Sequence, residues 1–240
     1  MESDISTQNI LGQSSSHIIY VDEDFCPVTK KGASFGLNKT VLSPLAELKA
    51  HAERDGFNLT VASGYRDFDR QLSIFNRKVN GELPVIDKNN QVVSVSTLSP
   101  TELLAAIMYF SALPGASRHH WGTDFDFYDK SLLPDGKSLE LAPWEYQNGG
   151  YFFELSQWLE ANAMQYGFYR PYDKYRGGVA AEPWHYSYYP LANTYQSSLS
   201  VDLLIATYHR GDILLKDEII DNMNRLYEQY VINVANPPYV

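Results

Sequence analysis

The sequence predicts an α+β protein in which a small antiparallel sheet is flanked by helices. Helical and strand-like segments mix without the regular strand–helix order of a parallel fold, and no Gly-rich dinucleotide motif is present. The 44% hydrophobic and 20% charged content is typical of a globular protein. A chain of 240 residues is also long enough to bury a sizeable core.

Periodicity and capping residues place the expected elements along the chain. Helices are predicted over residues 43–56, 67–79, 100–113 and 152–167, strands over 58–64, 123–129 and 182–189, and a loop or small hairpin over 80–98. Asp67 and Ser99 are expected to cap helices, with Pro100 at a first helical position. Two further helices, broken near Gly211, are predicted from Ser197 onward, whereas the polar residues 1–16 are expected to be poorly ordered.

Charge and composition exclude several classes of function. A formal net charge of -10 argues against nucleic acid or anionic lipid as the main partner. No apolar run approaches the roughly 20 residues of a membrane span. The single Cys26 excludes an intrachain disulfide framework. The first residues lack the features of a secretory signal, so the cytoplasm is the expected location, or the periplasm or cell envelope if a signal has been removed.

The stretch "SRHHWGTDFD" offers two ligands for a metal ion. A catalytic zinc site needs three protein ligands and one position open for water. His119 and Asp126 are seven residues apart, which would put them on opposite faces of a straight strand. Gly122 lies between them and permits a bend that would bring them together, with His119 in the incoming turn.

The stretch "EPWH" supplies a third ligand and a carboxylate. His185 offers a ring nitrogen, and Glu182 stands three residues before it. Pro183 interrupts a regular strand at this point, so both side chains could face one cavity. A carboxylate beside a zinc-bound water could act as general base and acid, and Glu182 fits that role.

The stretch "SGYRDFDRQ" contributes hydrogen-bond donors to the same region. Arg66 follows a predicted strand, where its fork of donors would suit a carboxylate or a developing oxyanion. Gln71, on the helix that follows, could reach the same cleft. Taken singly, each of these residues also has an ordinary structural explanation as a turn or surface group. His120 and Asp124 form a rival pair, which we interpret as neighbours of the site and not as ligands.

Taken in order, these motifs resemble those of a known enzyme family. "SRHHWGTDFD" matches the pattern S-x-H-x-x-G-x-x-x-D, "EPWH" matches E-x-x-H, and "SGYRDFDRQ" matches the upstream "SGYR…Q" element. The chain therefore resembles the zinc D,D-carboxypeptidases and dipeptidases of the VanY and VanX type, which cleave peptidoglycan peptides. The resemblance covers roughly residues 38–190.

The resemblance implies a role for each matching residue. His119, Asp126 and His185 would bind one Zn²⁺ per chain, Glu182 would be the general base and acid, and Arg66 would stabilise the oxyanion. Ser117 would help to hold the terminal carboxylate of the substrate, and Gln71 would be a substrate-side polar group. The chain departs from the common pattern at Arg118, where relatives frequently have an acidic residue.

The implied organisation is a zinc peptidase core over residues 38–190, between an N-terminal extension (1–37) and a helical C-terminal extension (191–240). The implied substrate is a peptidoglycan stem peptide or muropeptide that ends in a D-amino acid. Two alternatives stay open within the same chemistry: an L,D-carboxypeptidase and an L-Ala-D-Glu endopeptidase. A non-catalytic, zinc-stabilised module that binds cell-wall peptides is the alternative from a different class.

Overall fold

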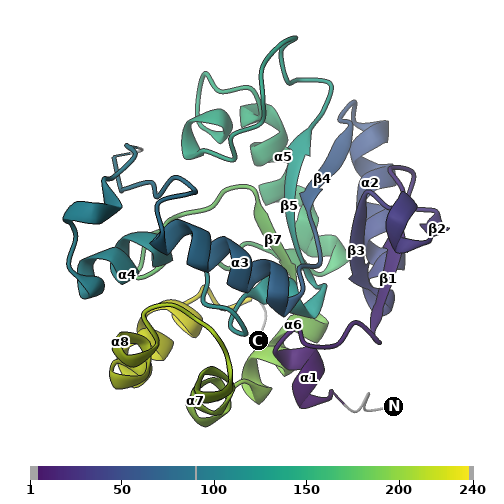
Figure 1. Cartoon of the computed structure of the whole chain (residues 1–240). Coiled ribbons are helices and arrows are strands. Elements are labelled where there is room, and N and C mark those ends of the chain that lie inside the picture. Colours follow the sequence, from purple (N-terminus) through teal and green to yellow (C-terminus); the bar gives the residue numbers. More distant parts are fainter. Residues whose placement is uncertain (1–4, 90, 238–240) are drawn as a thin grey trace.

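A four-stranded antiparallel sheet in the order β4-β5-β7-β6 lies at the centre of the computed structural model, which describes residues 5–89 and 91–237 (Figure 1). Its strands are β4 (Leu59–Ser63), β5 (Asp124–Asp129), β6 (Phe168–Tyr169) and β7 (His185–Tyr188). A second antiparallel sheet in the order β2-β1-β3 consists of β1 (Ile18–Val21), β2 (Pro27–Val28) and β3 (Phe35–Asn38). The predicted α+β class with a small antiparallel sheet is confirmed.

Helices surround the two sheets. They are α1 (Thr7–Ile10), α2 (Leu42–Arg54), α3 (Phe68–Val79), α4 (Pro100–Met108), α5 (Phe153–Asn162), α6 (Tyr189–Ser198), α7 (Val201–Arg210), α8 (Lys216–Asp221) and α9 (Met223–Leu226), which continues into a π-helical turn (Tyr227–Val231). Figure 1 shows α3 crossing in front of the central sheet, α2 beside the second sheet, and α6 to α8 gathered below.

Local chemistry explains where the helices beside the site begin. The Asp67 side chain accepts a hydrogen bond from the Arg70 backbone N–H at 2.9 Å and so caps α3. Ser99 and Glu102 form a reciprocal capping box at the start of α4, with Pro100 in its first turn. Both predicted caps are therefore present in the structure.

Two hydrophobic clusters hold the elements together. The first packs the second sheet, α2 and α5 against one face of the central sheet, where Phe125 and Phe127 of β5 are fully buried. The second joins α3 and α4 to the C-terminal helices. It also contains Trp121, from the turn before β5, and Ile10 and Leu11 from the N-terminal segment. The segments at both ends of the chain thus share a core with the middle.

The N-terminal region is more ordered than the sequence predicts. Residues 1–4 lie outside the described part, but Thr7–Ile10 forms a helix, and Ile10 and Leu11 are buried. The Trp121 ring N–H donates a hydrogen bond to the Ile10 carbonyl oxygen at 3.2 Å, which fixes this helix to the core. The prediction of disorder was therefore wrong for residues 5–16, because two apolar side chains in a polar segment were enough to anchor it.

The C-terminal region begins its helical part earlier than predicted. The aromatic run ending at Tyr189 reads as a strand, but only His185–Tyr188 forms β7, and α6 starts at Tyr189 with Pro190 in its first turn. The expected boundaries after residues 37 and 190 fall inside β3 and α6. The three-part division stays a prediction, and the shared core shows that the parts pack as one body.

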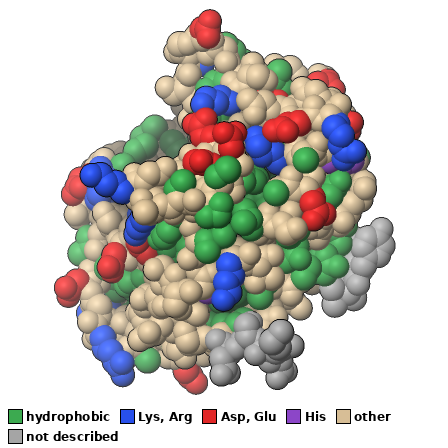
Figure 2. Space-filling view, turned by 90° about the vertical axis from the view of Figure 1, so that its right-hand side faces the viewer, with side chains coloured by type: hydrophobic (Ala, Val, Ile, Leu, Met, Phe, Trp, Pro, Cys, Tyr) green, Lys and Arg blue, Asp and Glu red, His purple; other side chains and the backbone are tan. Residues whose placement is uncertain are grey.

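The surface and the helices add two observations. Figure 2 shows acidic and basic side chains interspersed over the face that carries the second sheet. Among the helices that the structure describes, none is long and apolar enough to cross a membrane.

A buried histidine makes stability depend on pH. His17 is 8% exposed and lies between the rings of Tyr65 and Tyr195. Neither of its ring nitrogens has a hydrogen-bond partner within the described part of the chain. Burial lowers the pKa of His17 from 6.5 to about 4; the nearby backbone of His120 opposes this shift, and the charge of Lys39 assists it. Between these two pKa values His17 is protonated in the unfolded chain but neutral in the folded chain. Stability contributed by neutral His17 is complete above pH 6.5 and is lost as the pH falls toward about 4.

We predict that His17→Phe reduces this loss of stability in acid. Urea unfolding at pH 7.5 and pH 5 should give a wild-type midpoint that falls more steeply than that of the variant. His209→Gln, at an exposed position on α7, serves as the control and should follow the wild type. Parallel pH dependences for wild type and His17→Phe would contradict the assignment.

Candidate active site

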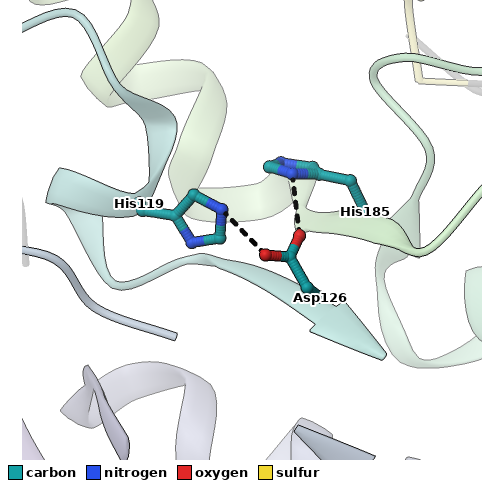
Figure 3. A group of neighbouring side chains, drawn as sticks. All are labelled: His119, Asp126 and His185. Atoms are coloured by element: carbon teal, nitrogen blue, oxygen red, sulfur yellow. Dashed lines mark ion pairs between the residues drawn. The ribbon is translucent and has the colours of Figure 1, made fainter. Parts of the chain in front are cut away.

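Three side chains from the central sheet and the turn before it converge on one point. His119 lies in a 3₁₀ turn (Arg118–Trp121), Asp126 lies on β5, and His185 opens β7 directly opposite Asp126 (Figure 3). His119 Nε2 is 3.5 Å from Asp126 Oδ2, and His185 Nδ1 is 3.2 Å from Asp126 Oδ1. All three residues are buried, and one ligand atom from each lies within 4.8 Å of the others.

Gly122 makes the convergence of His119 and Asp126 possible. It ends the 3₁₀ turn in the left-handed conformation, with φ of 66°. A Cβ atom at this position would lie 2.5 Å from Ile18 Cδ1 and 2.6 Å from the Asn38 backbone nitrogen, so only glycine fits. The structure thus places His119 in a turn and Asp126 in the strand, on either side of this glycine.

Hydrogen bonds fix which nitrogen of each histidine faces Asp126. His119 Nδ1 lies 2.9 Å from the Gly64 carbonyl oxygen and can only donate there, which leaves the Nε2 lone pair toward Asp126. His185 Nε2 lies 3.0 Å from Asp124 Oδ1, which leaves Nδ1 toward Asp126. Burial lowers the pKa of His119 to about 4, so this ring is neutral.

The buried polar atoms fit a cation. Among the residues that the structure describes, none donates a hydrogen bond to Asp126 Oδ1, although this atom is buried and close to His185 Nδ1. A tetrahedral zinc ion with bonds of about 2.0–2.1 Å holds its ligand atoms about 3.3 Å apart. Each histidine nitrogen lies at about this distance from one Asp126 oxygen, 3.5 Å from Oδ2 and 3.2 Å from Oδ1, and one ligand atom from each residue lies within 4.8 Å of the others. Burial opposes a charge on His185, but its hydrogen bond to Asp124 and the charge of Asp126 raise the pKa of His185 to about 10. A metal ion and a proton therefore compete for Nδ1.

Glu182 lies beside the three ligands. Its Oε2 atom is 3.4 Å from His185 Nδ1, and the residue is 8% exposed. The turn that holds it precedes β7, where the His185 N–H donates to the Glu182 carbonyl oxygen at 3.1 Å. Burial raises the pKa of Glu182 to about 7, although the neighbouring charge on His185 opposes the shift. A carboxyl group with such a pKa can both accept and return a proton near neutrality.

Arg66 faces the same region from the loop between β4 and α3. Its two terminal nitrogens donate to Gln71 Oε1 at 2.8 Å and to Ser63 Oγ at 3.1 Å. Gln71 is fully buried, and its own amide donates to the Ala112 carbonyl oxygen at 2.7 Å. Both polar ends of Gln71 are thus occupied inside the protein. The substrate-side role expected for Gln71 stays a prediction, and its contacts show that it supports Arg66.

Ser117 and His120 differ in their relation to the site. Ser117 is 2% exposed, precedes the 3₁₀ turn and is one of the residues that line the cavity described below. His120 points away: Nε2 accepts from the Gly115 N–H at 2.9 Å, so Nδ1 donates to the Arg66 carbonyl oxygen at 2.6 Å. His120 therefore braces the backbone beneath Arg66, in agreement with its interpretation as a neighbour.

Sequence reasoning missed the pair Arg118 and Asp124. Asp124 is fully buried and joins His185 Nε2 to Arg118 Nε, which is 2.7 Å from Asp124 Oδ1. Burial opposes a charge on Asp124, but the charge of Arg118 holds its pKa well below its usual range. The available signal was the spacing of Asp124 and Asp126, because residues two apart on a strand share a face.

A cavity of about 540 Å³ opens over these groups. Its polar wall includes Arg66, Ser117, His119, Asp126, Glu182 and His185. Its apolar wall includes Ile86, Phe110, Leu141, Val179 and Trp184. A cavity of this volume accommodates a small ligand, and apolar walls with a few convergent polar groups are typical of such sites.

Known proteins resemble this chain across the site and beyond it. The chain is 41% identical over 122 residues to an uncharacterised protein of Haemophilus influenzae, covering 50% of this chain and 93% of that protein. It is 28% identical over 174 residues to a D-alanyl-D-alanine carboxypeptidase of Enterococcus faecalis, covering 71% of this chain and 51% of that enzyme. Among solved structures, VanYB in complex with D-Alanine-D-Alanine aligns over 81% of this chain and 92% of that one, with a TM-score of 0.50 and 22% identity, and it shares the fold.

The family model described as "VanY: D-alanyl-D-alanine carboxypeptidase" matches residues 34–191. This range contains every residue to which the sequence motifs assign a role, from Arg66 to His185. The match confirms the resemblance seen in the motifs. The chain belongs to the VanY family of D-alanyl-D-alanine carboxypeptidases.

Proposed function

We propose that this protein is a zinc-dependent carboxypeptidase that removes the C-terminal D-amino acid from peptidoglycan stem peptides. The observation that carries the proposal is the convergence of three ligand atoms, a buried carboxylate and a guanidinium group on one cavity. A binding module needs the ligands alone. Glu182 and Arg66 favour catalysis because they supply proton transfer and stabilisation of an oxyanion.

The donor set suits zinc better than magnesium or calcium. Two imidazole nitrogens and one carboxylate oxygen, with a further position open toward the cavity, match a catalytic zinc site. Magnesium and calcium prefer ligand sets made of oxygen atoms alone. Bound at His119, Asp126 and His185, zinc would activate a water molecule and polarise the scissile carbonyl group.

The residues around the ligands divide the remaining work. Glu182 would take the proton of the attacking water and later deliver it to the leaving amine, since its carboxylate lies 3.4 Å from His185 Nδ1. Arg66 would donate to the carbonyl oxygen as negative charge develops on it, because Ser63 and Gln71 hold its guanidinium in place. Ser117 would contact the terminal carboxylate of the substrate.

The family match favours a carboxypeptidase over an endopeptidase. The cavity is lined by residues from six parts of the chain, near residues 66, 84–86, 110–119, 126, 140–143 and 172–185, and its volume suits the end of a peptide. An L,D-carboxypeptidase would use the same groups on a neighbouring bond. We prefer D-Ala-D-Ala-type substrates because the family match covers all the proposed catalytic and ligand residues.

We predict that the purified protein contains about one zinc ion per chain and releases D-Ala from a stem pentapeptide. Tetrapeptide and free D-Ala-D-Ala would be offered in parallel to identify the bond. Removal of the metal with a chelator should abolish release, and stoichiometric zinc should restore it. Absence of zinc binding would contradict the metal site, whereas zinc binding without cleavage of any peptide would favour the endopeptidase or the binding module.

Glu182→Gln should retain zinc but lose activity. The amide keeps the size of the side chain and cannot accept the proton of water, so kcat should fall by a factor of about 10²–10⁴. Zinc content by mass spectrometry and kcat on the preferred peptide would be measured on the same preparation. Full zinc occupancy together with undiminished turnover would exclude Glu182 as the general base.

Arg66→Lys should impair catalysis although it preserves the charge. An ammonium group cannot contact Ser63, Gln71 and a carbonyl oxygen with the fixed fork of a guanidinium. We expect kcat to fall by about 10²–10³ with zinc binding unchanged. Arg70→Lys, an exposed position on α3, is the matched control and should retain activity. Wild-type kcat in Arg66→Lys would remove Arg66 from the mechanism.

The protein acts in the compartment in which it meets its substrate. Peptides with C-terminal D-amino acids could reach the protein in the cytoplasm or, after export, in the periplasm or cell envelope. Fractionation of cells that express the natural gene, followed by detection of the protein in each fraction, separates the two.

A further inference from the structure

A chain of buried hydrogen bonds runs from the C-terminal helix α6 to a proposed metal ligand. Gln196 of α6 accepts from Arg118 Nη1 at 2.5 Å, and Arg118 Nε donates to Asp124 Oδ1 at 2.7 Å. Asp124 Oδ1 in turn lies 3.0 Å from His185 Nε2. His185, a proposed metal ligand, is thus connected through Asp124 and Arg118 to Gln196, which lies beyond the family match.

Asp124 determines the orientation of His185. A histidine offers one nitrogen to a metal only when the other carries the proton, and a carboxylate acceptor at Nε2 selects that tautomer. The acceptor also fixes the rotation of the ring, because the bond at Nε2 and the direction of Nδ1 lie in one plane. Asp126 alone cannot do this, since it lies on the metal side of the ring.

Arg118 in turn keeps Asp124 in place. A fully buried carboxylate is costly unless it is paired and hydrogen-bonded. Asp124 is satisfied by Arg118, by Thr123 Oγ1 at 2.7 Å and by Ser187 Oγ at 3.1 Å. Arg118 also donates to Ser187 Oγ at 2.7 Å, so both residues bind the same hydroxyl group.

The position of Arg118 is itself determined from several sides. The residue is 3% exposed, and its guanidinium lies 4.8 Å from the ring centroid of Trp121. Gln196 and the Tyr169 hydroxyl accept from its terminal nitrogens. A planar group with donors on three sides is needed here, which a lysine cannot provide. The contact with Gln196 joins Arg118 to α6.

We propose that Asp124 is a positioning residue for His185. Arg118, itself held by Gln196 of α6, keeps the Asp124 carboxylate in place. The inference rests on the proposed metal site. It assigns a role to the departure from the family pattern at Arg118. It also gives the C-terminal helices a part in metal binding.

Zinc affinity tests the proposal without reliance on activity. Dissociation constants would be measured by chelator competition on wild type, Asp124→Asn and Asp124→Ala. Loss of the carboxylate should weaken zinc binding by about 10- to 100-fold. The absorption spectrum of the cobalt-substituted protein should change, because His185 no longer holds its angle to the metal. On the preferred peptide, kcat should fall with KM nearly unchanged, since Asp124 does not reach the substrate.

Gln196→Ala provides a milder variant should the buried substitutions fail to fold. It removes one acceptor from Arg118 and should weaken zinc binding about three- to tenfold. Asn193→Ala, at an exposed position on the same helix, is the control and should bind zinc as the wild type does.

The outcomes separate this inference from the proposed function. A wild type that binds no zinc overturns both. The positioning role alone is overturned if the wild type binds zinc and cleaves peptide but the folded variants behave like it. In that case Asp124→Asn and Gln196→Ala would bind zinc within twofold of the wild-type affinity and would give the same cobalt spectrum. Lower melting temperatures of the metal-free variants at unchanged affinity would likewise reduce Asp124 to a structural residue and overturn the inference.

Discussion

The pairing of β5 with β7 is the constraint on which the site depends. In the observed register Asp126 lies opposite His185 and Asp124 opposite Ser187. Because side chains alternate along a strand, both aspartates share one face, and Phe125 and Phe127 share the other. A shift of the pairing by one residue would place the two carboxylates in the hydrophobic core and the two phenyl rings at the candidate metal site. The hydrophobic core on one face therefore fixes the ligand geometry on the other.

The turn before β5 completes the geometry that the sheet begins. His119 cannot reach Asp126 from a straight strand, and the left-handed Gly122 provides the change of direction. Two contacts hold the turn in place. Trp121 stacks on Tyr195 with 5.8 Å between ring centroids. The Arg66 backbone N–H donates to the His119 carbonyl oxygen at 3.1 Å. This backbone hydrogen bond fixes the positions of His119 and Arg66 relative to each other.

The sequence indicated the candidate metal ligands better than it indicated the residues that hold them in place. Residue types and spacing indicated His119, Asp126 and His185 because a metal demands particular donors, and Gly122 marked the bend between the first two. The partners of Arg118 could not be predicted, since Ser187 and Gln196 come from distant parts of the chain. The strands of the second sheet, of two to four residues, are too short for a periodic signal. Pro190 could have indicated the early start of α6, but the aromatic bias before it favoured a strand.

Metal ligands must be held to within about half an ångström, and this demand explains why the supports come from beyond the sheet. The family match ends at residue 191, yet Tyr195 packs against the turn that carries His119 and Gln196 anchors Arg118. The Tyr195 hydroxyl also accepts from the Asn38 side chain at 3.3 Å, and Asn38 donates its backbone N–H to the Gly122 carbonyl oxygen at 2.8 Å. The helix α6 thus contacts the site through both the second sheet and Arg118. In this protein the region after the family match contacts the residues that hold the candidate ligands.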